Sequence, residues 1–107
     1  MQSRTRLIRT LDELILAKFI LDQNKLTSKP LALSEILRQI KQSGKWEVTK
    51  AFRQVAYRFL DRLLKLSFID IYYETENPEW RYFVFWFKTD CVQRLQKEID
   101  DVRSNIC

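Results

Sequence analysis

The chain has 107 residues, of which 46% are hydrophobic and 13% aromatic, and its formal net charge is +5. A chain of this length and composition predicts one small domain, residues 1–107, with a real core. A single glycine and the lack of any histidine argue against glycine-rich phosphate loops, His-based nucleophile pairs and His-ligated zinc, so we expect neither enzyme activity nor a cofactor.

Cysteine usage and hydropathy indicate a reducing setting away from membranes. Cys91 and Cys107 are too far apart for a CxxC motif and too few for a disulfide scaffold, which leaves a redox role for them open. Charged residues interrupt every apolar run before it reaches the roughly 18 residues of a membrane span. The N-terminus has no long apolar stretch typical of a secretory signal. We therefore expect a cytoplasmic protein without membrane contact.

The N-terminal part combines a basic tail with a very apolar helix. Residues 1–10 carry Arg4, Arg6 and Arg9, which could follow a phosphate backbone or remain a frayed tail. Thr10 and Glu13 form a T-x-x-E capping box that predicts a helix over residues 11–24. This helix is apolar around most of its circumference, so we expect the core on one side and a further partner, such as a second copy of the chain, on the other.

Residues 34–66 predict two helices joined by a tight turn. A short extended strip at 31–33 precedes Ser34, which is expected to cap a helix over residues 35–42. Gly44 suits a left-handed C-terminal cap, and Trp46 in the following turn suits a packing anchor better than a wedge between bases.

The next helix is expected from Val48 or Thr49 to Leu66. Its apolar residues recur at helical spacing and define one buried face, which consists of Phe52, Val55, Ala56, Phe59, Leu63 and Leu66.

Residues 68–87 predict a β-hairpin, because two segments rich in aromatic and β-branched residues, 68–74 and 80–87, flank a polar tip. The second strand is apolar on both faces, which favours burial on both sides over an exposed platform that stacks single-stranded nucleic acid. The tip is acidic, with one basic neighbour, and these residues are Glu74, Glu76, Glu79 and Arg81.

A last helix is expected over residues 89–106, with Thr89 and Asp90 at its start. Its apolar positions alternate by three and four residues, as in the seam of a short coiled coil. We expect this seam to form a homodimer, and the alternative is that the helix packs back on the first helix and the hairpin. The seam residues are Val92, Leu95, Ile99, Val102 and Ile106.

The order of these elements and the stretch FLDRLLKLSFIDI, residues 59–71, resemble the winged helix-turn-helix domain of MarR-type and PadR-type transcriptional regulators. Leu60, Leu63, Phe68 and Ile69 occupy apolar positions of the family pattern, and Ser67 stands where the family usually has glycine. The similarity spans residues 33–87. The implied fold is mainly α with a β-hairpin (α+β), a winged helix-turn-helix with an extra C-terminal helix.

The resemblance implies a function for the helix from Thr49. In regulators of this fold, that helix enters the major groove of double-stranded DNA, and its N-terminal half contacts bases and phosphates. We therefore expect a sequence-specific DNA-binding protein, a dimeric transcriptional regulator, and the simpler alternative is a solvated polar face. The candidate DNA contacts are Lys45, Lys50, Arg53, Gln54, Tyr57 and Arg58.

Charge is distributed unevenly along the chain. Residues 34–66 hold eight bases and three acids, whereas residues 67–107 hold five bases and eight acids. The basic surplus favours phosphate binding by the two middle helices. The acidic hairpin tip would be repelled by DNA, and it favours the alternative of a winged-helix module that binds a protein partner through the hairpin and makes no DNA contact.

Overall fold

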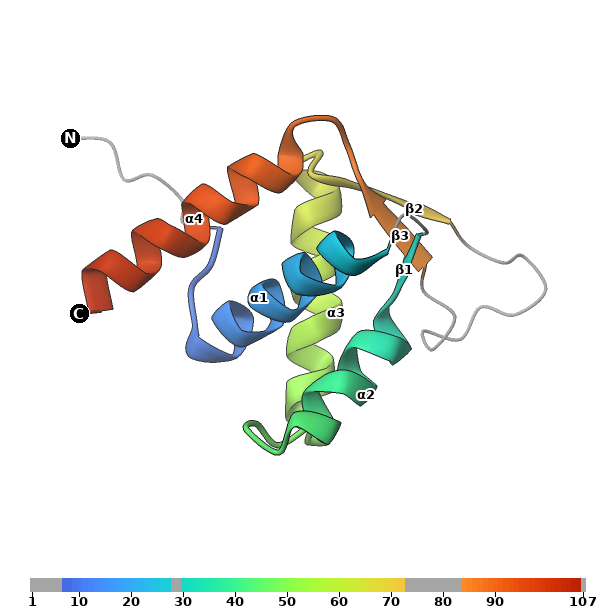
Figure 1. Ribbon diagram of the computed structural model, residues 1–107, viewed down its shortest axis with the longest axis vertical. Helices are drawn as coiled ribbons and strands as arrows, with labels where there is room; N and C mark the ends of the chain where they lie inside the picture. Colours follow the sequence, from blue (N-terminus) through green and yellow to red (C-terminus); the bar gives the residue numbers. More distant parts are fainter. Residues whose placement is uncertain (1–6, 28–29, 73–83, 107) are drawn as a thin grey trace.

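The computed structural model describes residues 7–27, 30–72 and 84–106. Within these residues the fold is mainly helical, with a small antiparallel sheet, and is of the α+β type (Figure 1). Its elements in chain order are α1 (Leu11–Leu26), β1 (Leu31–Ala32), α2 (Leu33–Ser43), α3 (Lys50–Lys65), β2 (Ile69–Tyr72), β3 (Val84–Phe87) and α4 (Cys91–Ile106). None of these helices has the length and apolar character needed to cross a membrane.

Helix α1 begins where the capping box predicts. The hydroxyl oxygen of Thr10 accepts a hydrogen bond from the backbone N–H of Glu13 at 3.2 Å. The helix contacts α2, α3 and α4, so the chain's own helices cover much of its apolar surface, although Leu11 is 54% exposed. The expectation that a second copy covers one side is therefore wrong for its buried residues, whose apolar members are Leu14, Leu16, Ala17, Ile20 and Leu21.

Helix α2 begins before the predicted cap. Ser34 lies inside the helix, and the N-cap is Ala32, which makes no side-chain cap hydrogen bond. The prediction of Ser34 as the cap is wrong because tertiary packing decides the helix start: Leu33 is buried in the core, and Ala32 still pairs with Val84 of β3. At the other end, Gly44 adopts the predicted left-handed conformation, with φ of 69°.

Helix α3 follows Thr49, as predicted, and ends with Leu66 as its C-cap. Leu66 was predicted on the buried face but is 48% exposed, because it lies beyond the last helical turn that packs on the core. The next residue, Ser67, has a left-handed backbone with φ of 63°. The buried side chains of α3 are Phe52, Ala56, Phe59, Leu60 and Leu63.

Strands β2 and β3 form the predicted hairpin, and the sheet order is β1-β3-β2. Phe85, in the central strand, lies opposite Leu31 of β1 and Ile71 of β2 and is buried. Trp86 points to the other face, as successive strand residues do, and is 40% exposed. The described residues of the chain itself therefore do not bury the second face of this strand at Trp86. The acidic tip, residues 74–79, and Arg81 lie outside the described residues.

The apolar seam of α4 lies against the chain's own core. Leu95 and Ile99 are buried, and Val92 and Val102 pack against the same cluster. Because α4 contacts α1, the seam is used within one chain, and the predicted dimer seam is corrected to the alternative. The side chain of Ile106 and all of Cys107 lie outside the described residues, and Cys91 is buried with a free thiol.

Residues 7–10 belong to the domain and are not part of a tail. Leu7 and Ile8 are 4% and 2% exposed and join the core. The backbone oxygen of Leu7 accepts a hydrogen bond from Arg62 on α3 at 2.7 Å. The predicted tail is wrong for these residues because two consecutive apolar side chains bury themselves, while Arg4 and Arg6 lie outside the described residues.

Candidate nucleic-acid interface

The N-terminal half of α3 presents a polar face to solvent because its opposite face is anchored in the core. The hydroxyl oxygen of Thr49 accepts from the backbone N–H of Phe52 at 3.1 Å and closes the first turn. Phe52, Ala56 and Phe59 are buried below it. At 100° per residue, side chains 50, 53, 54, 57 and 58 then fall within less than half of the helix circumference, on the side away from the core.

The structure places five of the six predicted DNA contacts on α3, and Lys45 lies in the turn that precedes this helix. Tyr57 is half-buried and has an interaction partner of its own. The exposed residues are Lys45, Lys50, Arg53, Gln54 and Arg58.

Basic residues predominate on this face of α3. Residues 48–60 contain three bases, Lys50, Arg53 and Arg58, and no acid. The nearest acid on the helix, Asp61, forms an ion pair with Lys65 at 2.9 Å. Asp61 lies on the same side of the helix as Arg58, but none of the three cations of the N-terminal half forms an ion pair with a described residue, which leaves their positive potential available to an anion.

Arg58 also extends this face toward the N-terminal segment. It lines a hollow of about 350 Å³ together with Arg9, Asp61, Arg62, Lys65 and Leu66. Four of these six side chains are basic, so positive charge continues from α3 to the segment before α1.

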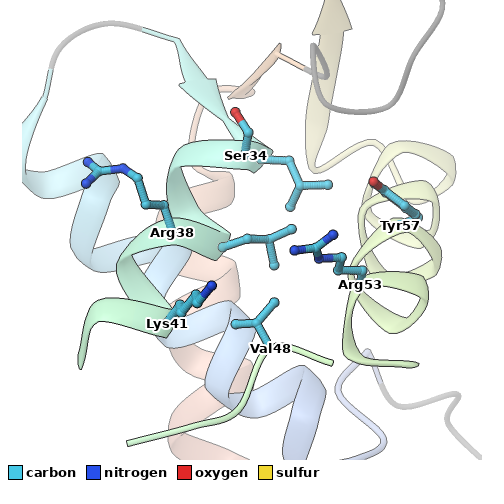
Figure 2. Close-up of a pocket in the computed structure, with 8 residues that line it drawn as sticks. Ser34, Arg38, Lys41, Val48, Arg53 and Tyr57 are labelled. Carbon is cyan, nitrogen blue, oxygen red and sulfur yellow. The ribbon is translucent and has the colours of Figure 1, made fainter. Parts of the chain in front are cut away.

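Between α2 and α3 lies a pocket of about 330 Å³, drawn in Figure 2. It joins Arg53 and Tyr57 from α3 with residues of α2 that were not predicted as site residues. These are Ser34, Arg38 and Lys41, which recur every three or four positions and so share one helical face. That spacing is the signal in the sequence that could have identified them; the wall is completed by Leu33, Leu37 and Val48.

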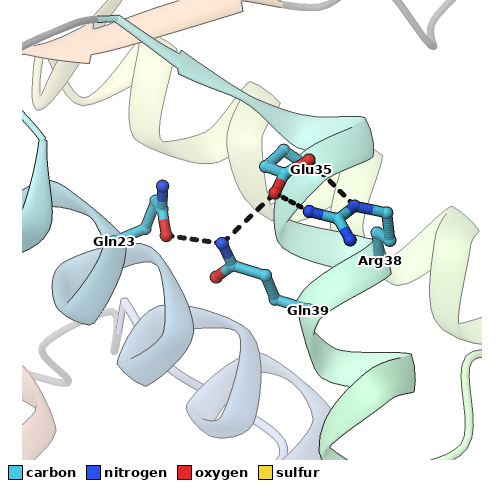
Figure 3. Close-up of polar contacts among 4 residues, drawn as sticks. All are labelled: Gln23, Glu35, Arg38 and Gln39. Carbon is cyan, nitrogen blue, oxygen red and sulfur yellow. Dashed lines mark hydrogen bonds and ion pairs between the residues drawn. The ribbon is translucent and has the colours of Figure 1, made fainter.

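Arg38 lines this pocket, and its guanidinium is bound to Glu35, one turn earlier on α2 (Figure 3). Its Nε donates to Glu35 Oε2 at 3.0 Å, and its Nη2 donates to the other carboxylate oxygen. These hydrogen bonds lower the pKa of the Glu35 carboxyl, and the same contact raises the pKa of Arg38. Gln39 Nε2 donates to Gln23 Oε1 of α1 at 2.6 Å, so the network also ties α2 to α1.

Lys45 lies in a second hollow, of about 450 Å³, which shares Lys41 and Val48 with the pocket. Glu47 lines the same hollow and partly offsets its charge. Trp46 is held by a hydrogen bond from its Nε1 to Asp12 on α1 at 3.1 Å and packs against the core, so it anchors the turn as predicted.

Comparison with protein-family models, curated proteins and solved structures gave no match. The assignment of a function to this face therefore depends on its geometry and charge.

Proposed function

We propose that the chain is a winged helix-turn-helix DNA-binding protein, a transcriptional regulator whose helix α3 lies in the major groove. The element order α1-β1-α2-α3-β2-β3-α4 and the sheet order β1-β3-β2 support this proposal, since it requires a helix pair followed by a hairpin. The resemblance of residues 59–71 to MarR-type and PadR-type regulators agrees with it.

The observation that carries the proposal is the exposed face of α3, where Lys50, Arg53 and Arg58 surround Gln54 and form no ion pair with a described residue. An amide side chain can pair with adenine, and arginine can pair with guanine or bind a phosphate. Cations at both ends of the face would hold the helix on the phosphate backbone, while Gln54, between them, faces the base edges.

A salt-dependent titration tests this proposal. A fluorescent random-sequence duplex is titrated with wild type, Arg58→Ala and, as a matched control, Arg103→Ala, which removes an exposed arginine from α4. We expect affinity to fall steeply with salt and the slope to drop by about one for Arg58→Ala only. No binding at low salt, or equal losses in both variants, would overturn the proposal.

Sequence reading by Gln54 is tested separately, by selection of bound duplexes from a random pool. Gln54→Ala is expected to relax the preference at one base position and to leave the salt slope unchanged. A wild-type protein that selects no sequence would contradict specific recognition.

One observation favours the alternative of a protein-binding winged helix. Trp86 is 40% exposed on the outer face of the sheet, and aromatic side chains are enriched at protein interfaces. The titration separates the two functions, because a module without DNA contact would show no binding to the duplex even at low salt.

A further inference from the structure

The pocket between α2 and α3 combines an apolar wall with a cation that has no carboxylate partner among the described residues. Leu33, Leu37 and Val48 form the aliphatic side of the pocket. Figure 2 shows the guanidinium of Arg53 reaching from α3 across the pocket toward α2. Among the described residues, Arg53 forms no ion pair, and no acid lines the pocket.

The second arginine of the pocket does not compete for the same ligand. Arg38 points away from Arg53 in Figure 2, and its Nε and Nη2 donate to the carboxylate of Glu35. Lys41, one turn further along α2, is exposed and lines the pocket without a carboxylate partner among the described residues. The charges left for a ligand are therefore those of Arg53 and Lys41, on opposite helices.

The wall decides which class of anion fits. An inorganic phosphate or a DNA phosphate would use the two cations and gain nothing from the aliphatic side chains. A carboxylate with an aliphatic body would use both, since the guanidinium fork matches a carboxylate and the leucines and valine match the body. The volume of about 330 Å³ lies at the lower end of the range typical of small-molecule sites.

We propose that this pocket binds a small aliphatic monocarboxylate, with Arg53 and Lys41 at the carboxylate and Leu37 and Val48 along the chain. Because Arg53 also belongs to the proposed DNA face, the bound acid offsets the charge of this arginine and competes with DNA. This regulatory part depends on the proposed function, whereas binding of the acid does not.

The binding test uses octanoate as the probe and needs no DNA. Calorimetric titration at low ionic strength compares octanoate with acetate, which has the carboxylate without the chain, and with octan-1-ol, which has the chain without the charge. We expect octanoate to bind at least about tenfold more tightly than either, because each control loses one of the two contributions. Equal binding of acetate or inorganic phosphate would overturn the choice of an organic acid.

Variants locate the site. Arg53→Gln is expected to weaken octanoate binding by about tenfold or more, and Arg58→Gln, on the same helix but outside the pocket, is expected to leave it unchanged. Circular dichroism checks that both variants are folded. Failure of octanoate to bind wild type, or equal affinity in wild type and Arg53→Gln, would overturn the site.

A third measurement separates this proposal from DNA binding itself. Octanoate is expected to raise the apparent Kd of wild type for the duplex and to have no such effect on Arg53→Gln. If octanoate binds and the duplex does not, the proposed DNA-binding function is wrong, whereas binding of the acid in the pocket is supported. If both bind without competition, the regulatory part is overturned.

Discussion

Arg62 and Glu13 form an ion pair that joins α3 to the first turn of α1, with 3.0 Å between Nη1 and Oε1. Their side chains are 20% and 6% exposed. The same carboxylate oxygen accepts from the backbone N–H of Arg9 at 2.7 Å, and the same Nη1 donates to the backbone oxygen of Leu7. Glu13, expected only as a capping residue, therefore also connects the N-terminal segment and α1 to α3.

Removal of the guanidinium is expected to destabilise the fold. Arg62→Met keeps most of the apolar stem but leaves the buried carboxylate of Glu13 without its cation, at a cost of about 3 kcal/mol in the free energy of unfolding. Chemical denaturation at neutral pH measures this loss. The control, Arg103→Met on the exposed side of α4, should stay within about 0.5 kcal/mol of wild type.

The double variant distinguishes an unpaired charge from lost packing. Glu13→Leu combined with Arg62→Met leaves no buried charge, so we expect it to be more stable than Arg62→Met alone. If the double variant lost as much free energy of unfolding as Glu13→Leu and Arg62→Met lose together, this account would be contradicted.

Ser67 occupies a position that favours glycine. Its N–H donates to Leu64 O at 3.1 Å and the N–H of Phe68 donates to Leu63 O at 2.8 Å, which is the Schellman pattern at the end of a helix. Its φ of 63° is unfavourable for a residue with a Cβ. Ser67→Gly is therefore expected to raise the melting temperature, with a gain of up to about 1 kcal/mol.

The control for Ser67 is another exposed serine with helical backbone. Ser104 lies in α4, where glycine is expected to cost about 0.5–1 kcal/mol instead. Destabilisation by both changes would show that the left-handed backbone of Ser67 carries no strain.

Features set by local chemistry could be predicted from the sequence. Thr10 and Thr49 start their helices because each hydroxyl accepts a hydrogen bond from the backbone N–H three residues later. Gly44 ends α2 because glycine, which has no Cβ, readily adopts the left-handed backbone of this position. Ser34 has a hydroxyl like that of Thr49 but does not cap α2, because burial of Leu33 places the helix start before Ser34.

Features set by contacts between elements could not be predicted. A spacing of three and four residues shows that one face of α4 is apolar, but it is the same whether α1 or a second chain covers Leu95 and Ile99. Likewise, periodicity placed Arg53 on the polar face of α3, but only the packing of α2 beside α3 shows that its guanidinium lies in a pocket with Lys41.

The pair of Glu35 and Arg38 predicts a shift in a titration. Because hydrogen bonds from Arg38 lower the folded-state pKa of Glu35, the pair stabilises the fold above the unfolded pKa of about 4.3. This contribution is lost as the pH falls through the folded-state pKa. An NMR titration of the Glu35 carboxyl should show its midpoint rise in Arg38→Ala and stay unchanged in Arg103→Ala. Equal midpoints in wild type and Arg38→Ala would contradict the contact.

Leu95 distinguishes a core position from a subunit interface. Its side chain is fully buried within one chain, so Leu95→Ala is expected to cost about 2–5 kcal/mol, whereas Gln93→Ala, on the exposed side of α4, should cost little. Thermal unfolding at two protein concentrations measures both effects. If the seam is internal, the melting temperature of wild type is independent of concentration. A melting temperature that rises with concentration in wild type but not in Leu95→Ala would instead assign this seam to a second copy of the chain.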